Sequence, residues 1–296
     1  MQITTLQSGK WTVNMATRII VFPRWAVEAG RELLPEWQRL FPKEETWVQR
    51  EVGTPSLIVR LDCTIVESAL RVFEIEERPA GIGITGQINP QFRERLEGLR
   101  VQWPLFSVVV SKQRQGCDDN LWAQILGLDE YRDGLVMVRA EPEEPEFHRL
   151  TPFSVSSVRM KGNKSYGVDL DWWRRVASPE ELPWDEPFVL KPLQGSKCHD
   201  LEVWVPKTSR HFDQVKGAST RTRVARTLLR NGAMYCQPFH SPMSFEDDPR
   251  MRMILRVYYG YEPQASSWQC LGGVWNARPN WIVHGASDAV FGPIQI

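Results

Sequence analysis

The sequence has no net charge and no long apolar run, and each absence excludes a class of protein. Its 296 residues contain 36 Lys and Arg against 36 Asp and Glu, so general attraction to nucleic acid or to an anionic membrane is not expected. The longest apolar runs, at 105–110 and 135–138, are far shorter than the roughly 20 residues that cross a bilayer. The first fifteen residues are polar and lack the apolar segment of a secretion signal, so we expect a cytoplasmic protein without membrane partners.

Several motifs that carry chemistry are also missing. The five cysteines are scattered without a C-x-x-C pair, which argues against a disulfide framework and against a zinc site. No GxxxxGK[ST] occurs, so P-loop nucleotide binding is not supported, and a single GxGxxG, at 81–86, is by itself too weak a signal to support Rossmann nucleotide binding. The five histidines are dispersed and no GxSxG occurs, which argues against a nucleophilic triad.

The composition is that of a folded globular protein, with 42% hydrophobic and 24% charged residues. Strand-like and helix-like runs alternate without a repeat period, which predicts a mixed α/β or α+β architecture. The acidic, proline-broken segment 141–146 is typical of a domain boundary. We therefore expect an N-terminal α/β lobe over residues 1–145 and a second, nucleotide-binding lobe over residues 146–296.

Hydrophobic periodicity locates the secondary structure. Helices are expected at 27–40, 119–126, 169–177 and 219–229. Strands are expected at 17–22, 56–63, 69–76, 105–111, 135–139, 188–191, 201–205, 234–237, 251–259, 268–275 and 281–284. The glycine-containing segment 79–86 is expected to be a loop.

Two neighbouring strand-like runs carry charged residues at a spacing of two. Residues two apart in a strand project to the same face, so Arg60 and Asp62 share one face of the first run. Glu74 and Glu76 share one face of the second run in the same way. If a loop of three to five residues turns at Ser68, Asp62 lies directly opposite Glu74.

Three carboxylates on one face repel one another unless a cation lies among them. Magnesium often combines one or two carboxylates with substrate phosphates, which points to a site at Asp62, Glu74 and Glu76. Arg60 beside that metal is placed to bind a phosphate oxygen. The alternative is a solvent-facing hairpin whose charges are merely hydrated. Under the metal interpretation, Asp62→Asn and Glu74→Gln abolish turnover and leave the melting temperature unchanged or raised.

A second candidate site is the strand that ends in Lys191 and runs into a loop containing Gly195, Ser196 and Lys197. A lysine at a strand end projects its ammonium group into the neighbouring cleft. Backbone N–H groups at Gly195 and Ser196 are suited to phosphate oxygens. The alternative is an ordinary surface lysine before a proline.

Further candidates lie near the C-terminal end of the sequence. Gln237 and Phe239 follow a strand, Arg256 lies within one, and Arg278 ends a glycine-containing run. Arginines within strands are costly to bury without an anionic partner. That partner is either a ligand phosphate or carboxylate, or a structural salt bridge.

Taken in this order, the motifs resemble the ATP-grasp superfamily, in the circularly permuted branch typified by glutathionylspermidine synthase. In that branch an R-x-D strand and an E-x-N strand precede a K-P strand. The matching residues of this sequence are Arg60, Asp62, Glu74, Glu76 and Lys191–Pro192. The resemblance implies an α+β fold with mixed and antiparallel sheets, in two or three sub-domains that enclose a nucleotide cleft.

The resemblance also implies an ATP- and Mg²⁺-dependent carboxylate–amine ligase. A small-molecule or peptide carboxylate would become an acylphosphate, which an amine substrate then attacks. Arg60 and Arg278 would contact the reacting groups, and Asp62, Glu74 and Glu76 would bind magnesium. The residues that would bind ATP are Lys191, Gly195, Ser196, Lys197, Gln237, Phe239 and Arg256.

Departures from the family pattern leave other interpretations open. Glu76 stands where the family has an amide, and segment 195–200 lacks a glycine-rich loop. The alternative is therefore a catalytically inactive ATP-grasp-like protein that binds nucleotide or acts as a scaffold. Release of phosphate from ATP distinguishes the active ligase from this inactive protein. A third interpretation, nucleic-acid binding by the arginine-rich segment 221–230, predicts steep salt dependence and conflicts with the neutral composition.

Overall fold

The computed structural model divides into two compact units. Unit 1 comprises Met1–Gln38, Pro42–Val158 and Pro242–Ile296, and unit 2 comprises Arg39–Phe41 and Arg159–Ser241. The predicted boundary at residue 145 differs from this division, because the C-terminal strands join the sheet of unit 1. The residues that the structure describes are 3–8, 11–39, 58–76, 79, 81–102, 106–109, 135–138, 174–193, 200–212, 215, 217–245, 248–281, 283 and 288–296.

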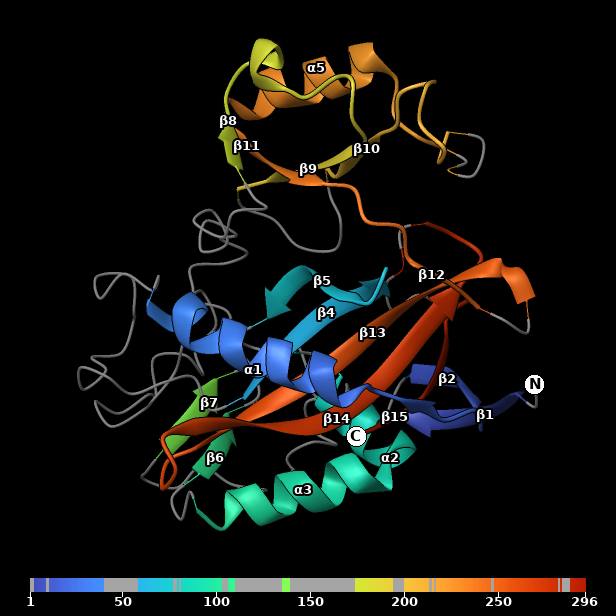
Figure 1. Cartoon of the computed structure of the whole chain (residues 1–296). Coiled ribbons are helices and arrows are strands. Elements are labelled where there is room, and N and C mark those ends of the chain that lie inside the picture. The colour runs from blue at the N-terminus through green and yellow to red at the C-terminus, as the bar shows by residue number, and fades with distance from the viewer. Residues whose placement is uncertain are drawn as a thin grey trace. The chain divides into compact units, whose positions relative to one another are not determined.

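Unit 1 is built on a mixed sheet that has nine strands within the described residues. They are β1 (Ile3–Ser8), β2 (Trp11–Ala16), β3 (Ile20–Val21), β4 (Ile58–Val66), β5 (Ala69–Glu76), β12 (Met243–Phe245), β13 (Asp248–Glu262), β14 (Ser267–Arg278) and β15 (Val290–Gln295). The order is β1-β2-β15-β14-β13-β4-β5, with β12 on β13 and β3 on β15 (Figure 1). Only the pairs that β15 makes with β2 and β3 are parallel. A separate parallel pair joins β6 (Phe106–Val109) and β7 (Leu135–Val138).

Helix α1 (Arg24–Arg39) packs on one face of the large sheet, where Figure 1 shows it crossing the strands. The hydroxyl of Tyr259 on β13 donates a hydrogen bond to the Val27 carbonyl at 3.2 Å. A Cβ at Gly30 would lie 2.2 Å from that hydroxyl oxygen. Glycine at this position therefore permits the close approach of helix and sheet.

Helices α2 (Ile82–Ile88) and α3 (Pro90–Arg100) pack on the opposite face. Tyr258 precedes Tyr259 on β13, so its side chain points to the other side of the sheet. Its hydroxyl accepts a hydrogen bond from Thr85 in α2 at 3.3 Å, and its ring lies 5.0 Å from that of Phe92 in α3. These contacts cover one part of the face and leave the neighbouring part to the polar residues described below.

Asn89 ties the two helices to the sheet. Its side chain accepts a hydrogen bond from the Phe92 N–H at 3.2 Å and so caps α3. The same amide donates to the carbonyls of Gly273 at 2.8 Å and Ile294 at 2.7 Å. This fully buried asparagine therefore has partners for both its oxygen and its nitrogen.

Unit 2 has an antiparallel sheet of four strands within the described residues, in the order β10-β9-β11-β8. The strands are β8 (Arg174–Val176), β9 (Phe188–Pro192), β10 (Glu202–Trp204) and β11 (Met234–Pro238), and a 3₁₀ turn lies at Pro179–Glu181. Helix α5 (Arg221–Asn231) covers one face (Figure 1). Its buried Val224 and Leu228 pack against Phe188, Leu190 and Met234 of the sheet.

The predicted α+β class with mixed and antiparallel sheets is confirmed. The loop predicted at 79–86 is wrong, because α2 begins at Ile82 after Gly81 adopts a left-handed conformation (φ 90°) and its apolar side chains are buried. The helix predicted at 169–177 is wrong at Arg174–Val176, which pairs with β11 as β8. Trp281 lies outside any strand, and the final strand is β15. The predicted helix at 119–126 and the boundary at 141–146 lie outside the described residues.

Candidate functional site

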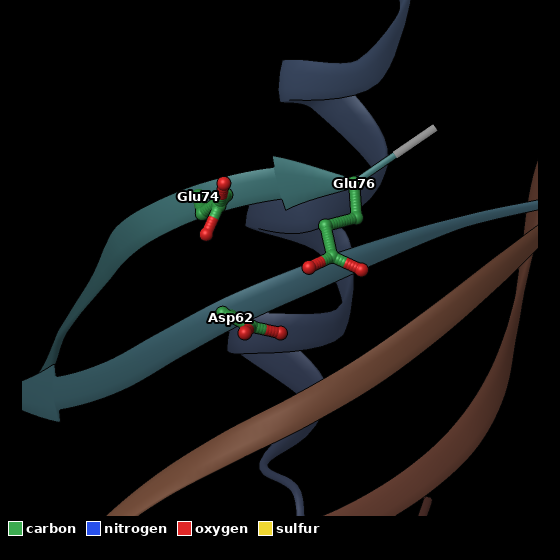
Figure 2. A group of neighbouring side chains, drawn as sticks. All are labelled: Asp62, Glu74 and Glu76. Carbon is green, nitrogen blue, oxygen red and sulfur yellow. The ribbon is translucent and has the colours of Figure 1, made fainter. Parts of the chain in front are cut away.

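The predicted acidic hairpin consists of β4 and β5 and carries Asp62, Glu74 and Glu76. The register confirms that Asp62 lies opposite Glu74 and places Arg60 opposite Glu76. All four side chains therefore share one face of the sheet. Carboxylate oxygens of the three acidic residues lie within 4.8 Å of one another, and Figure 2 shows them gathered over the two strands.

A bulge in the hairpin produces this alignment. The strands are joined by a two-residue turn at Glu67 and Ser68, both with positive φ (51° and 58°), in place of the expected three to five residues. Such a turn alone would put Phe73 opposite Asp62. The register shifts by one residue beside Asp62, which brings Glu74 opposite it. The acidic cluster thus depends on the bulge.

Arg60 holds the carboxylates of this hairpin in place. Its side chain is 3% exposed, and its Nε and Nη2 donate to the two oxygens of Asp62 at 2.5 and 3.0 Å. The same Nη2 lies 2.9 Å from Glu76. Burial by itself lowers the pKa of Arg60, but the charges of Asp62 and Glu76 outweigh it and hold that pKa above its usual value. The structure therefore pairs Arg60 with carboxylates, where the sequence analysis expected a phosphate.

The carboxylates of the hairpin repel one another. Burial raises the pKa of the Glu76 carboxyl group, and the charges of Asp62 and Glu74 raise it further against the opposing effect of Arg60. Arg60 is shared between Asp62 and Glu76, and Arg256 lies near Asp62. A hard divalent cation fits this donor set, because it takes carboxylate oxygens and would relieve the repulsion.

Polar side chains on the same face of the sheet continue from the acidic hairpin onto β13 and β14. Arg256 lies opposite Asp62, with its Nε 3.6 Å from Oδ2 of that carboxylate. The register of β13 with β14 puts Asn276 and Arg278 on the same face as Arg256. Arg278 donates to Asp288 at 3.0 Å, which is the structural salt bridge weighed above.

Asn276 is a residue that the sequence analysis did not select. Its side chain is fully buried. Among the described residues, neither its amide nitrogen nor its amide oxygen has a hydrogen-bond partner. Its spacing of two from Arg278 could have placed it on the polar face. The lack of hydrogen-bond partners among the described residues, however, follows only from the three-dimensional structure.

The two glycines that precede Asn276 have a structural role. Gly272 has a positive φ of 89°, beside the irregularity where the register of β13 with β14 shifts. A Cβ at Gly273 would lie 1.9 Å from the Arg256 carbonyl oxygen. Only glycine permits this approach of the backbones.

Unit 2 brings two of the predicted ATP-binding residues to one face of its sheet. Lys191 on β9 lies opposite Tyr235 on β11, and Gln237 follows two residues later on the same face. The alternating residues Leu190 and Cys236 belong to the core under α5. Lys191 and Gln237 therefore face away from α5, and both are buried, at 6% and 1% exposure.

The remaining predicted ATP contacts are less well supported or not described. The backbone N–H of Phe239 donates to the Pro187 carbonyl at 3.0 Å, so it is already used within the fold. Its ring lies edge-on to that of His211, with centroids 5.6 Å apart. Gly195, Ser196 and Lys197 lie outside the described residues.

Three of the four arginines of α5 have partners within unit 2, which weakens the nucleic-acid interpretation. One guanidinium stacks on an indole ring at 4.6 Å, and two others pair with carboxylates at 2.9 and 2.5 Å. These pairs are Arg221 with Trp184, Arg223 with Glu202, and Arg230 with Asp200. Two of the four positive charges are thus compensated by carboxylates of unit 2.

None of the helices in the described part of the chain has the length and hydropathy of a membrane-spanning segment. Cys63, Cys236 and Cys270 are free thiols buried in the fold, as expected for a sequence without a disulfide framework.

Comparison with known proteins gives a distant structural likeness. The sequence matches no protein-family model and no curated protein. Among solved structures, the fold is similar to that of a protein from Methylobacillus flagellatus KT named "Putative gamma-glutamylcysteine synthetase". The TM-score is 0.45 at 9% sequence identity, and the likeness covers 81% of this chain and 80% of that chain.

Proposed function

We propose that this protein is an ATP- and Mg²⁺-dependent carboxylate–amine ligase that works through an acylphosphate. The observation that carries the proposal is the acidic hairpin, whose three carboxylates gather on one sheet face beside two arginines. This is the arrangement that the resemblance to circularly permuted ATP-grasp enzymes implies. Magnesium would supply charge neutralisation for the phosphates of ATP.

Each residue of the hairpin then has a role. Asp62, Glu74 and Glu76 hold the metal through oxygen atoms that already lie close together. Arg60 is a positioning residue, because its guanidinium fixes Asp62 and Glu76 from a buried location. Phosphoryl transfer requires mainly positioning and charge neutralisation, so no side-chain nucleophile is needed.

In unit 2, we assign ATP phosphate binding to Lys191 and nucleotide contacts to Gln237. Their common face, opposite α5, supports this assignment. Arg278 remains a candidate for contact with the reacting groups and Arg256 a candidate for contact with ATP, because both share the polar face of the acidic hairpin.

A nucleotide-binding protein without catalysis is the second candidate. It is favoured by the ion pair of Glu76 with Arg60 at 2.9 Å. A carboxylate that is paired with arginine is less available to a metal ion than the free amide that the family has at this position. The two candidates differ in phosphate release and agree in nucleotide binding.

The test is a hydroxamate assay with hydroxylamine as the amine and a panel of amino acids and short peptides as carboxylates. Hydroxylamine attacks an acylphosphate and gives a coloured hydroxamate, with release of ADP and phosphate. We expect Mg²⁺-dependent product with the wild-type protein and loss of at least 100-fold in Glu74→Gln. Nucleotide binding without hydroxamate or phosphate release for any carboxylate would favour the second candidate.

The assignment of Lys191 is tested with a second lysine of the same unit. Lys191→Ala should weaken ATP binding about tenfold or more, because a charge-assisted contact to a phosphate is lost. Lys207 is exposed, and Lys207→Ala is the matched control with unchanged affinity. Equal effects of the two substitutions on the calorimetric dissociation constant would refute the assignment.

A further inference from the structure

Asn276 stands out among the polar residues of the large sheet. It lies on β14 in register with Ile254 of β13, and Ile254 is two residues from Arg256 on the same face. Arg256 in turn lies opposite Asp62 on β4. Strand β13 therefore separates the acidic hairpin from Asn276, with Arg256 between them on the shared face.

The two fully buried asparagines of the described residues differ in one respect. Asn89 uses its nitrogen and its oxygen in three hydrogen bonds to Phe92, Gly273 and Ile294. Asn276 is equally buried and has none among the described residues. A buried amide without partners destabilises a fold, so a residue of this kind is expected where a ligand supplies the missing partners.

The neighbouring charge indicates what kind of ligand this is. The Nε of Arg256 also lacks a hydrogen-bond partner among the described residues, since Asp62 lies beyond hydrogen-bond distance at 3.6 Å. Two N–H donors, one of them cationic, thus lie on the β14 side of the acidic hairpin. A cation would be repelled by Arg256 at this position, whereas an anionic oxygen would accept from both donors.

We propose that Asn276 and Arg256 together bind one anionic oxygen of the substrates, either a phosphate oxygen of the nucleotide or a carboxylate oxygen of the acid. In this arrangement the metal lies on the β4–β5 side of Arg256 and the oxyanion on the β14 side. The proposal rests on the proposed function for the identity of the ligand. Its evidence is that, among the described residues, the amide of Asn276 and the Nε of Arg256 have no hydrogen-bond partner, which does not depend on a bound metal.

The test compares Asn276→Leu with the wild-type protein in calorimetric titrations with three probes: inorganic phosphate, acetate, and ATP with Mg²⁺. Leucine has nearly the shape of asparagine but no polar atoms. We expect at least tenfold weaker binding of ATP with Mg²⁺ and of one simple anion, because a charge-assisted hydrogen bond is lost. Selective loss of phosphate assigns the oxygen to the nucleotide, and selective loss of acetate assigns it to the carboxylate substrate.

The melting temperature distinguishes a ligand-binding asparagine from a structural one, because replacing a structural asparagine should lower it. Because Asn276→Leu removes buried unpartnered groups, we expect an unchanged or higher melting temperature together with the weaker binding. Asn89→Leu is the matched control, and it should lower the melting temperature strongly, since two carbonyls lose their donor. Asn231→Leu, at the exposed end of α5, should change neither quantity.

Asn276→Asp covers the case in which the leucine variant folds poorly. It keeps the shape of the side chain and adds a negative charge, so we expect it to weaken anion binding at least as much. Unchanged anion affinity in either folded variant would overturn the proposal, as would a wild-type protein that binds none of the three probes. Both results differ from a failure of the proposed function, which is the absence of Mg²⁺-dependent hydroxamate formation by the wild-type protein.

Discussion

Two regions of the molecule hold carboxylates in different ways. In unit 2, Glu202 is 3% exposed and accepts hydrogen bonds from Ser219, from Arg223 at 3.0 Å and from Thr227 at 2.8 Å. One carboxylate thus has three donors. In unit 1, Asp62 and Glu76 of the acidic hairpin share Arg60, and Asp62 also lies 3.6 Å from Arg256.

The difference distinguishes a structural carboxylate from the proposed metal site. A carboxylate whose donors are all supplied by the protein stabilises the fold and needs nothing further. Carboxylates that lie close together and share one guanidinium repel one another, and a bound cation would relieve that repulsion. The sharing of Arg60 by Asp62 and Glu76, against three donors to the single carboxylate of Glu202, therefore distinguishes the acidic hairpin from the Glu202 site.

The largest effect on stability is expected at the structural site. Glu202→Leu should lower the free energy of unfolding by about 3 kcal/mol, because the donors of Ser219 and Thr227 lose their acceptor in a buried place. Asp200→Asn, which removes only the exposed pair with Arg230, should cost less than about 1 kcal/mol. Urea denaturation measures both. Similar losses in the two variants would show that Glu202 is not the structural carboxylate described above.

A smaller loss is expected for Asp62→Asn, about 2 kcal/mol by urea denaturation, because buried Arg60 loses the charge of its main partner. This corrects the expectation from the sequence that the variant keeps or raises its melting temperature.

Glu74→Gln should change the free energy of unfolding by less than about 0.5 kcal/mol relative to the wild-type protein. Both variants should lose Mg²⁺ binding by calorimetry. An Asp62→Asn variant as stable as the wild-type protein would refute the structural part of this role.

A small effect of the opposite sign is expected for Glu76→Gln. Because the folded state raises the pKa of Glu76, it holds that proton more tightly than the unfolded chain, and stability falls as the pH rises above about 4.3, the ordinary value for glutamate. Glutamine removes this dependence, so the variant should be more stable by up to about 1 kcal/mol at neutral pH and equal below pH about 4.

Magnesium sharpens the same measurement. The ion should stabilise the wild-type protein more than Glu76→Gln at neutral pH, because the cation relieves the repulsion that the substitution has already removed. Denaturation midpoints at several pH values, with and without Mg²⁺, test both statements. A variant that is less stable than the wild-type protein at neutral pH would contradict the unfavourable environment of the ionised Glu76 carboxylate.

Much of the fold could be predicted from local patterns. Strands β4, β5, β9, β11, β13 and β14 and helices α1 and α5 follow from hydrophobic periodicity, which depends on neighbouring residues alone. Helix α2 was missed because its glycines are typical of a loop, and β8 because its few residues become a strand only by pairing with β11. Such pairing depends on residues far away in the sequence.

Which charged side chains share a face follows from their spacing alone, because residues two apart in a strand, such as Arg60 and Asp62 or Glu74 and Glu76, project to the same side. How those faces align, and which residues they meet, depends on strand pairing in three dimensions. The bulge beside Asp62, the double ion pair of Arg60, and the position of Arg256 opposite Asp62 come from strand pairing across as many as 194 positions (256 − 62). That Asn276 has no hydrogen-bond partner among the described residues has the same origin, because hydrogen bonding depends on distance in space.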